Sequence, residues 1–337
     1  MDQLDEALVR LAATGPEFHG GLSNHGPMVA EALVRLGSAE TIPAWISAYL
    51  PRLDERPVAR AAITEWRDGL GDKSRTGDWT AYFTAALAEA PWQDVLAVWW
   101  PRLTPGLAAG ATHGIIRVAH AVRAVEAEPT EPRRRELAHA LAYWAAAYAE
   151  LPGRPVTAGL RTAEQVAAVL PVLQLAPRGL IGEHLGNLRD LPEFAAAVRS
   201  LRPPTDVVAD LIELSRVFAG VFLAHAAHAP IPFVHAVTAP VVVSSILHLL
   251  PAETWRGTYE RLWQMSAALY SGYAYGSIAE PRPETDPPDA VELAGRAVET
   301  GEEHVIKLTE AALRQHAVTA DPVFLQASAR VIEVLAR

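Results

Sequence analysis

The sequence predicts an all-α fold, and three observations lead to this prediction. Apolar residues recur at helical spacing along almost the whole chain, and alternating β-branched runs bounded by hairpin turns are scarce. Glycine and proline also stand where helices would begin and end. We therefore expect a multi-helix bundle without a substantial sheet.

Helical spacing is clearest in three stretches of the chain. The apolar positions that define them are Leu4, Leu8 and Leu11; Val29, Leu33 and Leu36; and Leu137, Leu141, Trp144 and Tyr148. Gly15-Pro16 follows the first stretch, Pro27 opens the second, and Gly37 follows the second. These signals predict one helix before Gly15, one from Pro27 to Leu36, and one through residues 137–148.

The chain of 337 residues is long enough for one large domain or two modest ones. The candidate site residues described below come from both ends and from the middle of the sequence. This distribution favours a single helical domain over residues 1–337 that brings them together. Proline-rich punctuation is densest at 280–288, where we expect a mobile loop.

Composition limits the class of protein. The 29 Lys and Arg stand against 39 Asp and Glu, and the resulting formal charge of −10 argues against a nucleic-acid or anionic-membrane partner. There is no Cys, so disulfides, thiolate metal ligands and a Cys nucleophile are excluded. Any metal must therefore be bound by His, by carboxylates or by a rarer ligand.

Two segments bear on where the protein resides. Residues 1–6 have neither the basic nor the apolar character of a secretory signal, so we expect a cytoplasmic protein. Residues 217–252 contain no Asp, Glu, Lys or Arg, but they contain histidines and prolines at a density that is costly in lipid. We expect a pair of buried core helices there, and no membrane span.

The 12 histidines are numerous for a chain of this size, and three of them stand in informative places. His25 directly precedes the helix opened by Pro27, and His113 stands beside Gly114 at a helix start. His235 lies inside the uncharged stretch, where an imidazole needs a metal or a polar partner to be buried. For His25, an exposed loop or capping role is the competing interpretation.

His120 follows His113 by seven residues. The two side chains then share a helix face but lie about 10 Å apart along the axis, so one ion cannot bind both. His120 is therefore a candidate for substrate contact or for support of a ligand. The alternative, slightly favoured from sequence, is a hydrogen-bonded core histidine.

The most informative segment is Thr300–Leu308. Thr300 and Glu303 have capping-box spacing, which predicts that a helix starts here and that His304 and Lys307 share one face. Only Lys73 and Lys307 are lysines, and every other residue among the 29 Lys and Arg is Arg. An amine, unlike a guanidinium, can lose its proton and capture carbon dioxide as a carbamate, which is a carboxylate-like metal ligand. An exposed His and Lys on a solvated helix face is the competing interpretation.

Several segments, taken in order, resemble the questin oxidase-like family. They are Asn24-His25 before a helix, His113-Gly114 with His120, Phe-Val-His-Ala-Val-Thr at 233–238, and Glu-Glu-His-Val-Ile-Lys at 302–307. The resemblance extends from about residue 19 to residue 316, and its Glu-His-x-x-Lys element is the most specific part.

This resemblance implies an α-helical oxygenase that opens a ring of an anthraquinone-type polyketide by cleaving a carbon-carbon bond with dioxygen. It also implies a non-haem iron centre with four histidines and a carboxylated lysine. Carried over to this sequence, the ligands are His25, His113, His235, His304 and carboxylated Lys307. Four imidazoles and one anionic oxygen suit Fe(II) and leave a sixth position for dioxygen or substrate. Glu303 would orient a ligand or cap the helix.

Three functional hypotheses follow. The first is an iron-dependent oxygenase whose internal apolar pocket, lined by aromatics such as Trp99, Trp100 and Phe233, takes a small polyketide-type aromatic. The second is a non-catalytic helical protein that binds or sequesters a hydrophobic metabolite. The third is a zinc hydrolase, which the lack of a His-Glu-x-x-His motif disfavours. No glycine-rich nicotinamide fingerprint is present, so the sequence leaves a need for NADPH open, as it does the oligomeric state.

Overall fold

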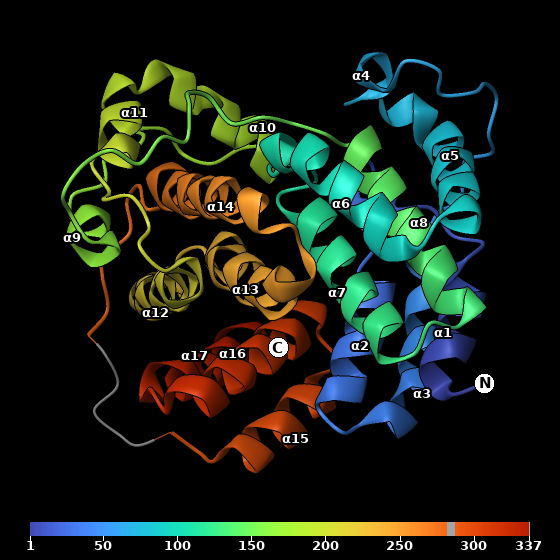
Figure 1. The fold of residues 1–337 in the computed structure, drawn as a ribbon. Coiled ribbons are helices and arrows are strands. Elements are labelled where there is room, and N and C mark those ends of the chain that lie inside the picture. Colours follow the sequence, from blue (N-terminus) through green and yellow to red (C-terminus); the bar gives the residue numbers. More distant parts are fainter. Residues whose placement is uncertain (282–286, 337) are drawn as a thin grey trace. The chain divides into compact units, whose positions relative to one another are not determined.

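A computed structural model describes residues 1–281 and 287–336 and shows that the protein is all-α (Figure 1). Within these residues there are seventeen α-helices and one hairpin of two-residue strands. The predicted fold class is therefore confirmed. Of the loop expected at 280–288, residues 282–286 lie outside the described residues.

The chain forms two compact units. Unit 1 consists of Met1–Glu150 and His248–Thr254, and unit 2 consists of Leu151–Leu247 and Trp255–Arg337. Each unit is described separately below. The expectation of a single functional domain over residues 1–337 stays a prediction.

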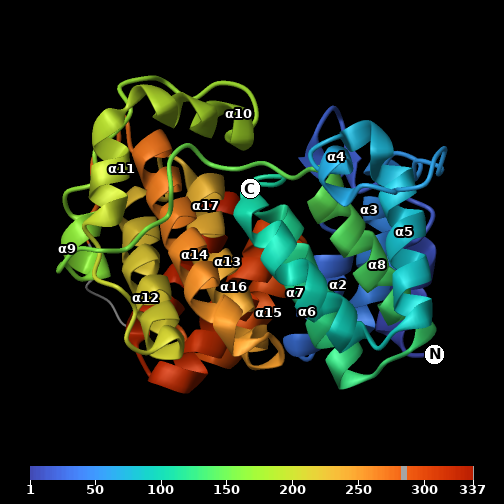
Figure 2. The ribbon, with the colours of Figure 1, turned by 45° about the horizontal axis from the view of Figure 1, so that its top comes forward.

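Unit 1 contains eight helices and the hairpin. They are α1 (Gln3–Leu11), β1 (Glu17–Phe18), β2 (Leu22–Ser23), α2 (Gly26–Arg35), α3 (Ile42–Tyr49), α4 (Trp66–Gly69), α5 (Thr76–Glu89), α6 (Trp92–Leu103), α7 (His113–Ala127) and α8 (Glu131–Ala146). Helix α8 packs against both α5 and α7, and α7 packs in turn against α2 (Figure 2). This packing places the start of α2 and the start of α7 in the same part of the unit.

The interior of unit 1 is rich in aromatic side chains. Trp79, Phe83 and Trp99 lie against one another with ring centroids 4.8 to 5.6 Å apart. Trp100 packs edge-on against Trp144 at 5.3 Å. Trp99 and Trp100, which the sequence analysis put forward as pocket walls, are therefore core residues of this unit.

Unit 2 contains the remaining helices. They are α9 (Ala163–Ala167), α10 (Ile181–Leu185), α11 (Pro192–Arg199), α12 (Val207–His225), α13 (Pro230–Ile246), α14 (Ala252–Tyr273, whose first three residues belong to unit 1), α15 (Ala290–Thr300), α16 (Glu303–Thr319) and α17 (Pro322–Leu335). Helix α13 packs against α12 and α16, and α16 packs against α17 (Figure 1). The helices that carry the candidate residues of this unit, α13 and α16, are thus direct neighbours.

Helix α13 is strongly apolar. Among the described helices, the segment Pro230–Leu249 is long and apolar enough to cross a membrane by length and composition, and 78% of its tested 18-residue stretch is buried inside the protein. Helix α12 ends at His225, Pro230 opens α13 after the four residues 226–229, and the two helices pack together. This arrangement agrees with the buried core helices expected for residues 217–252.

Aspartate side chains set the starts of several helices. Asp2, Asp206, Asp289 and Asp321 each accept a hydrogen bond from a backbone N–H in the first turn of the helix that follows. These carboxylates satisfy amides that have no partner within the helix, and their charge suits the positive end of the helix dipole. Short polar residues before apolar periodic segments are therefore the local signal that makes the helix boundaries predictable.

Candidate metal-binding residues

His25 is the N-cap residue of α2 in unit 1 and is buried. Its backbone N–H donates to Tyr49 Oη at 2.8 Å. The neighbouring Asn24 side chain donates to the Gly15 carbonyl at 2.9 Å and accepts from the Gly26 amide at 2.9 Å. The loop that carries His25 is therefore fixed on both sides, and the exposed-loop alternative does not hold.

His113 is the first residue of α7 and is also buried. Its Nδ1 lies 2.5 Å from the Gly110 carbonyl oxygen, which can only accept, so Nδ1 carries the proton and donates it. Nε2 then holds the lone pair that a metal requires. The ring centroids of His113 and His25 are 4.6 Å apart, and ring nitrogens of the two lie within 4.8 Å of each other. Unit 1 thus presents a pair of histidines.

Unit 2 presents a second pair. His235 on α13 is 1% exposed, and its ring centroid lies 5.5 Å from that of His304 on α16. The packing of α13 against α16 brings these two residues together although 69 positions separate them in the sequence. Both members of this pair belong to the set that the sequence analysis singled out.

Glu302 fixes the orientation of His304. Its Oε1 accepts from His304 Nδ1 at 2.9 Å, so the proton sits on Nδ1 and Nε2 holds the lone pair. Its other oxygen caps α16 by accepting from the amides of His304 and Val305. Burial alone would raise the pKa of Glu302, but the hydrogen bond from His304 lowers it below its ordinary value. The carboxylate is therefore held in its charged form.

This arrangement corrects one detail of the sequence prediction. A helix does start here, but its N-cap is Glu302 and its first residue is Glu303, so the capping box between Thr300 and Glu303 is absent. Thr300 Oγ1 instead accepts from the Glu302 amide at 3.1 Å. The physical reason is that Glu302, two residues after the expected N-cap Thr300, caps the helix with its own carboxylate. Support of a ligand by Glu303 stays a prediction, and its carboxylate lies within 4.8 Å of a ligand atom of His304.

Lys307 lies one turn after His304 on α16 and is only 2% exposed. Its Nζ is buried and makes no hydrogen bond to any described residue. Burial lowers the pKa of Lys307 from 10.5 to about 8, although the carboxylates of Glu303 and Glu302 act in the opposite direction. The alternative of a solvated lysine on an exposed face is therefore wrong, and a buried amine follows His304 by three residues on the same helix.

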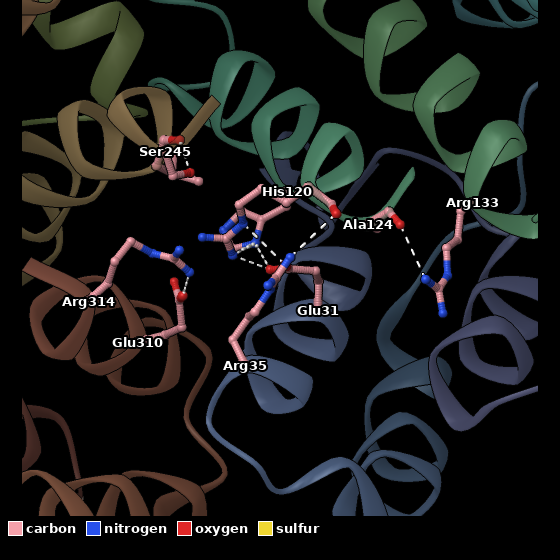
Figure 3. A network of polar contacts seen from close by, with 10 residues as sticks. Glu31, Arg35, His120, Ala124, Arg133, Ser245, Glu310 and Arg314 are labelled. Atoms are coloured by element: carbon pink, nitrogen blue, oxygen red, sulfur yellow. Dashed lines mark hydrogen bonds and ion pairs between the residues drawn. The ribbon is translucent and has the colours of Figure 1, made fainter. Parts of the chain in front are cut away.

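His120 lies in a buried network of charged side chains in unit 1. Its Nδ1 donates to Glu31 Oε2 at 2.8 Å, and Glu31 also pairs with Arg123 and, at 2.9 Å, with Arg35 (Figure 3). Burial alone would raise the pKa of Glu31, but the Arg123 guanidinium and the His120 hydrogen bond lower it well below its usual range. His120 is thus a hydrogen-bonded core histidine, and its contact with substrate stays a prediction.

Other histidines have visible structural partners. They are His139 with Arg56 at 3.3 Å, His184 with the Gly272 carbonyl at 2.8 Å, His225 with Ser277 at 2.7 Å and His316 with the Asp321 carbonyl at 3.0 Å. Burial lowers the pKa of His139 to about 3, so this ring is neutral at physiological pH. These residues serve as controls for the candidate ligands.

Sequence reasoning missed three groups that hold histidine side chains. The sequence prediction gave the role of orienting a ligand to Glu303, whereas Glu302 orients His304. A carboxylate two residues before a histidine at a helix start is a recognisable signal for this contact. Glu31, which holds His120, lies 89 positions away and has no local signal. The backbone at Gly110 that holds His113 was also missed, because its conformation depends on side chains from α8.

The fold and these side chains define an all-helical protein whose imidazole-rich donor groups suit a transition metal. The chain belongs to the Questin oxidase-like family, whose model matches residues 22–312. All five candidate ligands lie inside this match. Membership of an oxidase-like family supports an oxidoreductase that uses dioxygen on a small polyketide-type substrate. No curated protein matches the chain.

Proposed function

We propose that the protein is an Fe(II)-dependent oxygenase of an anthraquinone-type aromatic polyketide. In this proposal one iron ion is bound by His25 and His113 of unit 1 and by His235, His304 and carboxylated Lys307 of unit 2. The common assignment to one ion rests on the family, whose match spans both units. The bound ion would supply the electrons with which dioxygen is activated.

The observation that carries the proposal is the buried amine of Lys307. A charged ammonium without a hydrogen bond is costly to bury, and this cost appears as the lowered pKa of about 8. Roughly one amine in ten is then neutral at pH 7, against about one in several thousand for an ordinary lysine. The neutral nitrogen can bond to the carbon of carbon dioxide and release one proton to water, which leaves an anionic carbamate oxygen.

The surroundings of Lys307 couple this carbamate to a cation. Glu302 and Glu303 already place negative charge at the start of α16, so a further anion there is unfavourable without a counter-charge. A divalent ion supplies that counter-charge and is itself held by the new anion. Metal and carbamate should therefore form together, and the imidazoles complete a donor set typical of Fe(II).

The residues around the second pair favour a flat apolar substrate. Phe233, Val234, Ala236 and Val237 flank His235 on α13, and all are buried. A ring system gains about 25 cal/mol for each Å² of apolar surface it buries, whereas a sugar or nucleotide would leave polar groups without partners. A tricyclic quinone or hydroquinone, opened by carbon-carbon cleavage, meets this requirement.

The test is oxygen uptake by protein reconstituted with Fe(II) without air. A panel of anthraquinones, their hydroquinones and small polar metabolites is assayed with an oxygen electrode, and products are identified by mass spectrometry. We expect oxygen uptake and a ring-opened product with the polycyclic compounds only. Tight binding of these compounds without oxygen uptake would instead support sequestration, and turnover of a polar metabolite alone would overturn both hypotheses.

A further inference from the structure

The three residues before His113 have an unusual backbone conformation. Gly110, Ala111 and Thr112 have φ angles of +52°, +54° and +76°, so all lie in the left-handed region. L-residues enter this region singly, because the Cβ atom approaches the following carbonyl, and consecutive residues are rare. The amide of His113 closes the turn by donating to the Gly110 carbonyl at 3.2 Å.

Thr112 adds two further costs to this turn. A β-branched residue tolerates positive φ poorly, and Thr112 is the N-cap of α7 without a side-chain capping bond. Its hydroxyl is buried and makes no hydrogen bond to any described residue. Such local conflicts persist only where the surrounding structure imposes them, and they are concentrated at functional sites.

Side chains of α8 impose the conformation. A Cβ on Gly110 would lie 2.1 Å from Tyr143 Oη, and this hydroxyl is itself held by Ser23 at 2.7 Å. A Cβ on Gly114 would lie 2.8 Å from the Trp144 ring. The turn therefore packs closely against α8 on both sides of His113.

The consequence falls on the His113 ring. The left-handed turn directs the Gly110 carbonyl back toward Nδ1 of the residue three positions later. That contact selects the tautomer with the proton on Nδ1 and fixes the ring 4.6 Å from His25. A right-handed turn at the same place would aim this carbonyl in another direction.

We propose that the left-handed turn Gly110–Thr112 is a positioning element that sets the tautomer and orientation of His113 before metal binds, at the expense of stability. This inference rests on the proposed function, because it takes His113 as a ligand. The turn should lower the stability of the metal-free protein and raise its affinity for metal. These two quantities can be measured separately.

Two alanines provide a matched pair of variants. Ala111 in the turn and Ala320 at the end of α16 both have φ of +54°. Glycine adopts this conformation without strain, so Ala111→Gly and Ala320→Gly should each raise the melting temperature of the metal-free protein by about 1–3 °C. Proline cannot adopt a positive φ, so Ala111→Pro breaks the left-handed turn that holds His113, and Ala320→Pro makes the same change at the end of α16.

The readouts are the ring ¹⁵N chemical shifts of His113 in metal-free protein and the calorimetric affinity for Co²⁺ under carbon dioxide. Wild type, Ala111→Gly and Ala320→Pro should show the Nδ1-protonated tautomer, whereas Ala111→Pro should show an average of both tautomers. Ala111→Pro should bind Co²⁺ about 3- to 10-fold more weakly, and Ala320→Pro within about twofold of wild type.

The outcomes separate this inference from the proposed function. Wild-type tautomer and wild-type Co²⁺ affinity in Ala111→Pro would overturn the positioning role and leave the proposed metal site standing. A wild-type protein that binds no Co²⁺ or Fe(II) would overturn both. Equal weakening by Ala111→Pro and Ala320→Pro would also overturn the positioning role, because a general loosening of the chain would then explain it.

Discussion

The two histidine pairs are oriented by different means. In unit 1, His113 donates to the carbonyl of a left-handed turn, so its tautomer depends on backbone conformation. In unit 2, His304 donates to the carboxylate of Glu302, which also caps the helix that carries it. A carbonyl partner changes the basicity of the imidazole little, whereas a carboxylate partner raises it and makes the ring a stronger ligand for a metal. The unit 2 pair, together with the buried amine of Lys307 on the same helix as His304, is therefore expected to contribute more to metal affinity.

The largest expected effect concerns Lys307. Lys307→Arg and Lys307→Ala should each reduce turnover by more than about 100-fold, because neither side chain can form a carbamate. This loss exceeds the effect of removing a side chain that only hydrogen-bonds a metal ligand. Steady-state oxygen uptake measures this. A small carboxylate such as acetate should restore part of the activity in Lys307→Ala but not in the bulkier Lys307→Arg. An arginine variant with full activity would refute the carbamate.

The next effect tests whether both pairs serve as ligands. Replacement of His25, His113, His235 or His304 by Ala should each lower iron occupancy to less than about one-tenth of wild type at equal iron concentration. His139→Ala and His316→Ala are the controls. His139 is buried, so its loss should lower the melting temperature while iron occupancy stays unchanged. Equal loss of iron in both groups would mean that destabilisation, not ligation, explains the result.

A smaller effect is expected from the residue that orients His304. Glu302→Gln keeps an oxygen that can cap α16 but removes the charge, so metal affinity should fall by about 10- to 100-fold. Calorimetric titration with Co²⁺ measures this change. Asp289→Asn, which alters the cap of the neighbouring helix α15 in the same way, should leave affinity unchanged. A larger loss in Glu303→Gln than in Glu302→Gln would return the orienting role to Glu303.

The smallest effect is on the pH dependence of stability in protein free of metal and carbon dioxide. Because the pKa of Lys307 is lowered from 10.5 to about 8, the folded state releases a proton that the unfolded state keeps between these pH values. Stability then rises with pH across this window and is lowest below pH 8. Lys307→Met should therefore be more stable than wild type at pH 7, and the difference should shrink toward pH 10.5. A constant difference in denaturant unfolding across this range would contradict the shift.

The contrast between the pairs also explains what the sequence could reveal. The helices, their caps and the fold class follow from local patterns, and so does the neighbourhood of His304, since Glu302, His304 and Lys307 lie within two turns. The closeness of His235 to His304 requires the packing of α13 on α16, which no local pattern specifies. The positive φ angles at 110–112 depend on Tyr143 and Trp144, more than 30 residues further along the chain.

The central claim is that both pairs bind the same ion, and metal stoichiometry tests it most directly. Protein reconstituted with Fe(II) and carbon dioxide without air, then freed of excess metal, is analysed for iron beside His113→Ala and His304→Ala. We predict one iron per chain in wild type and almost none in either variant. Two irons per chain in wild type, or one iron retained by a variant in which a single pair is intact, would contradict the account.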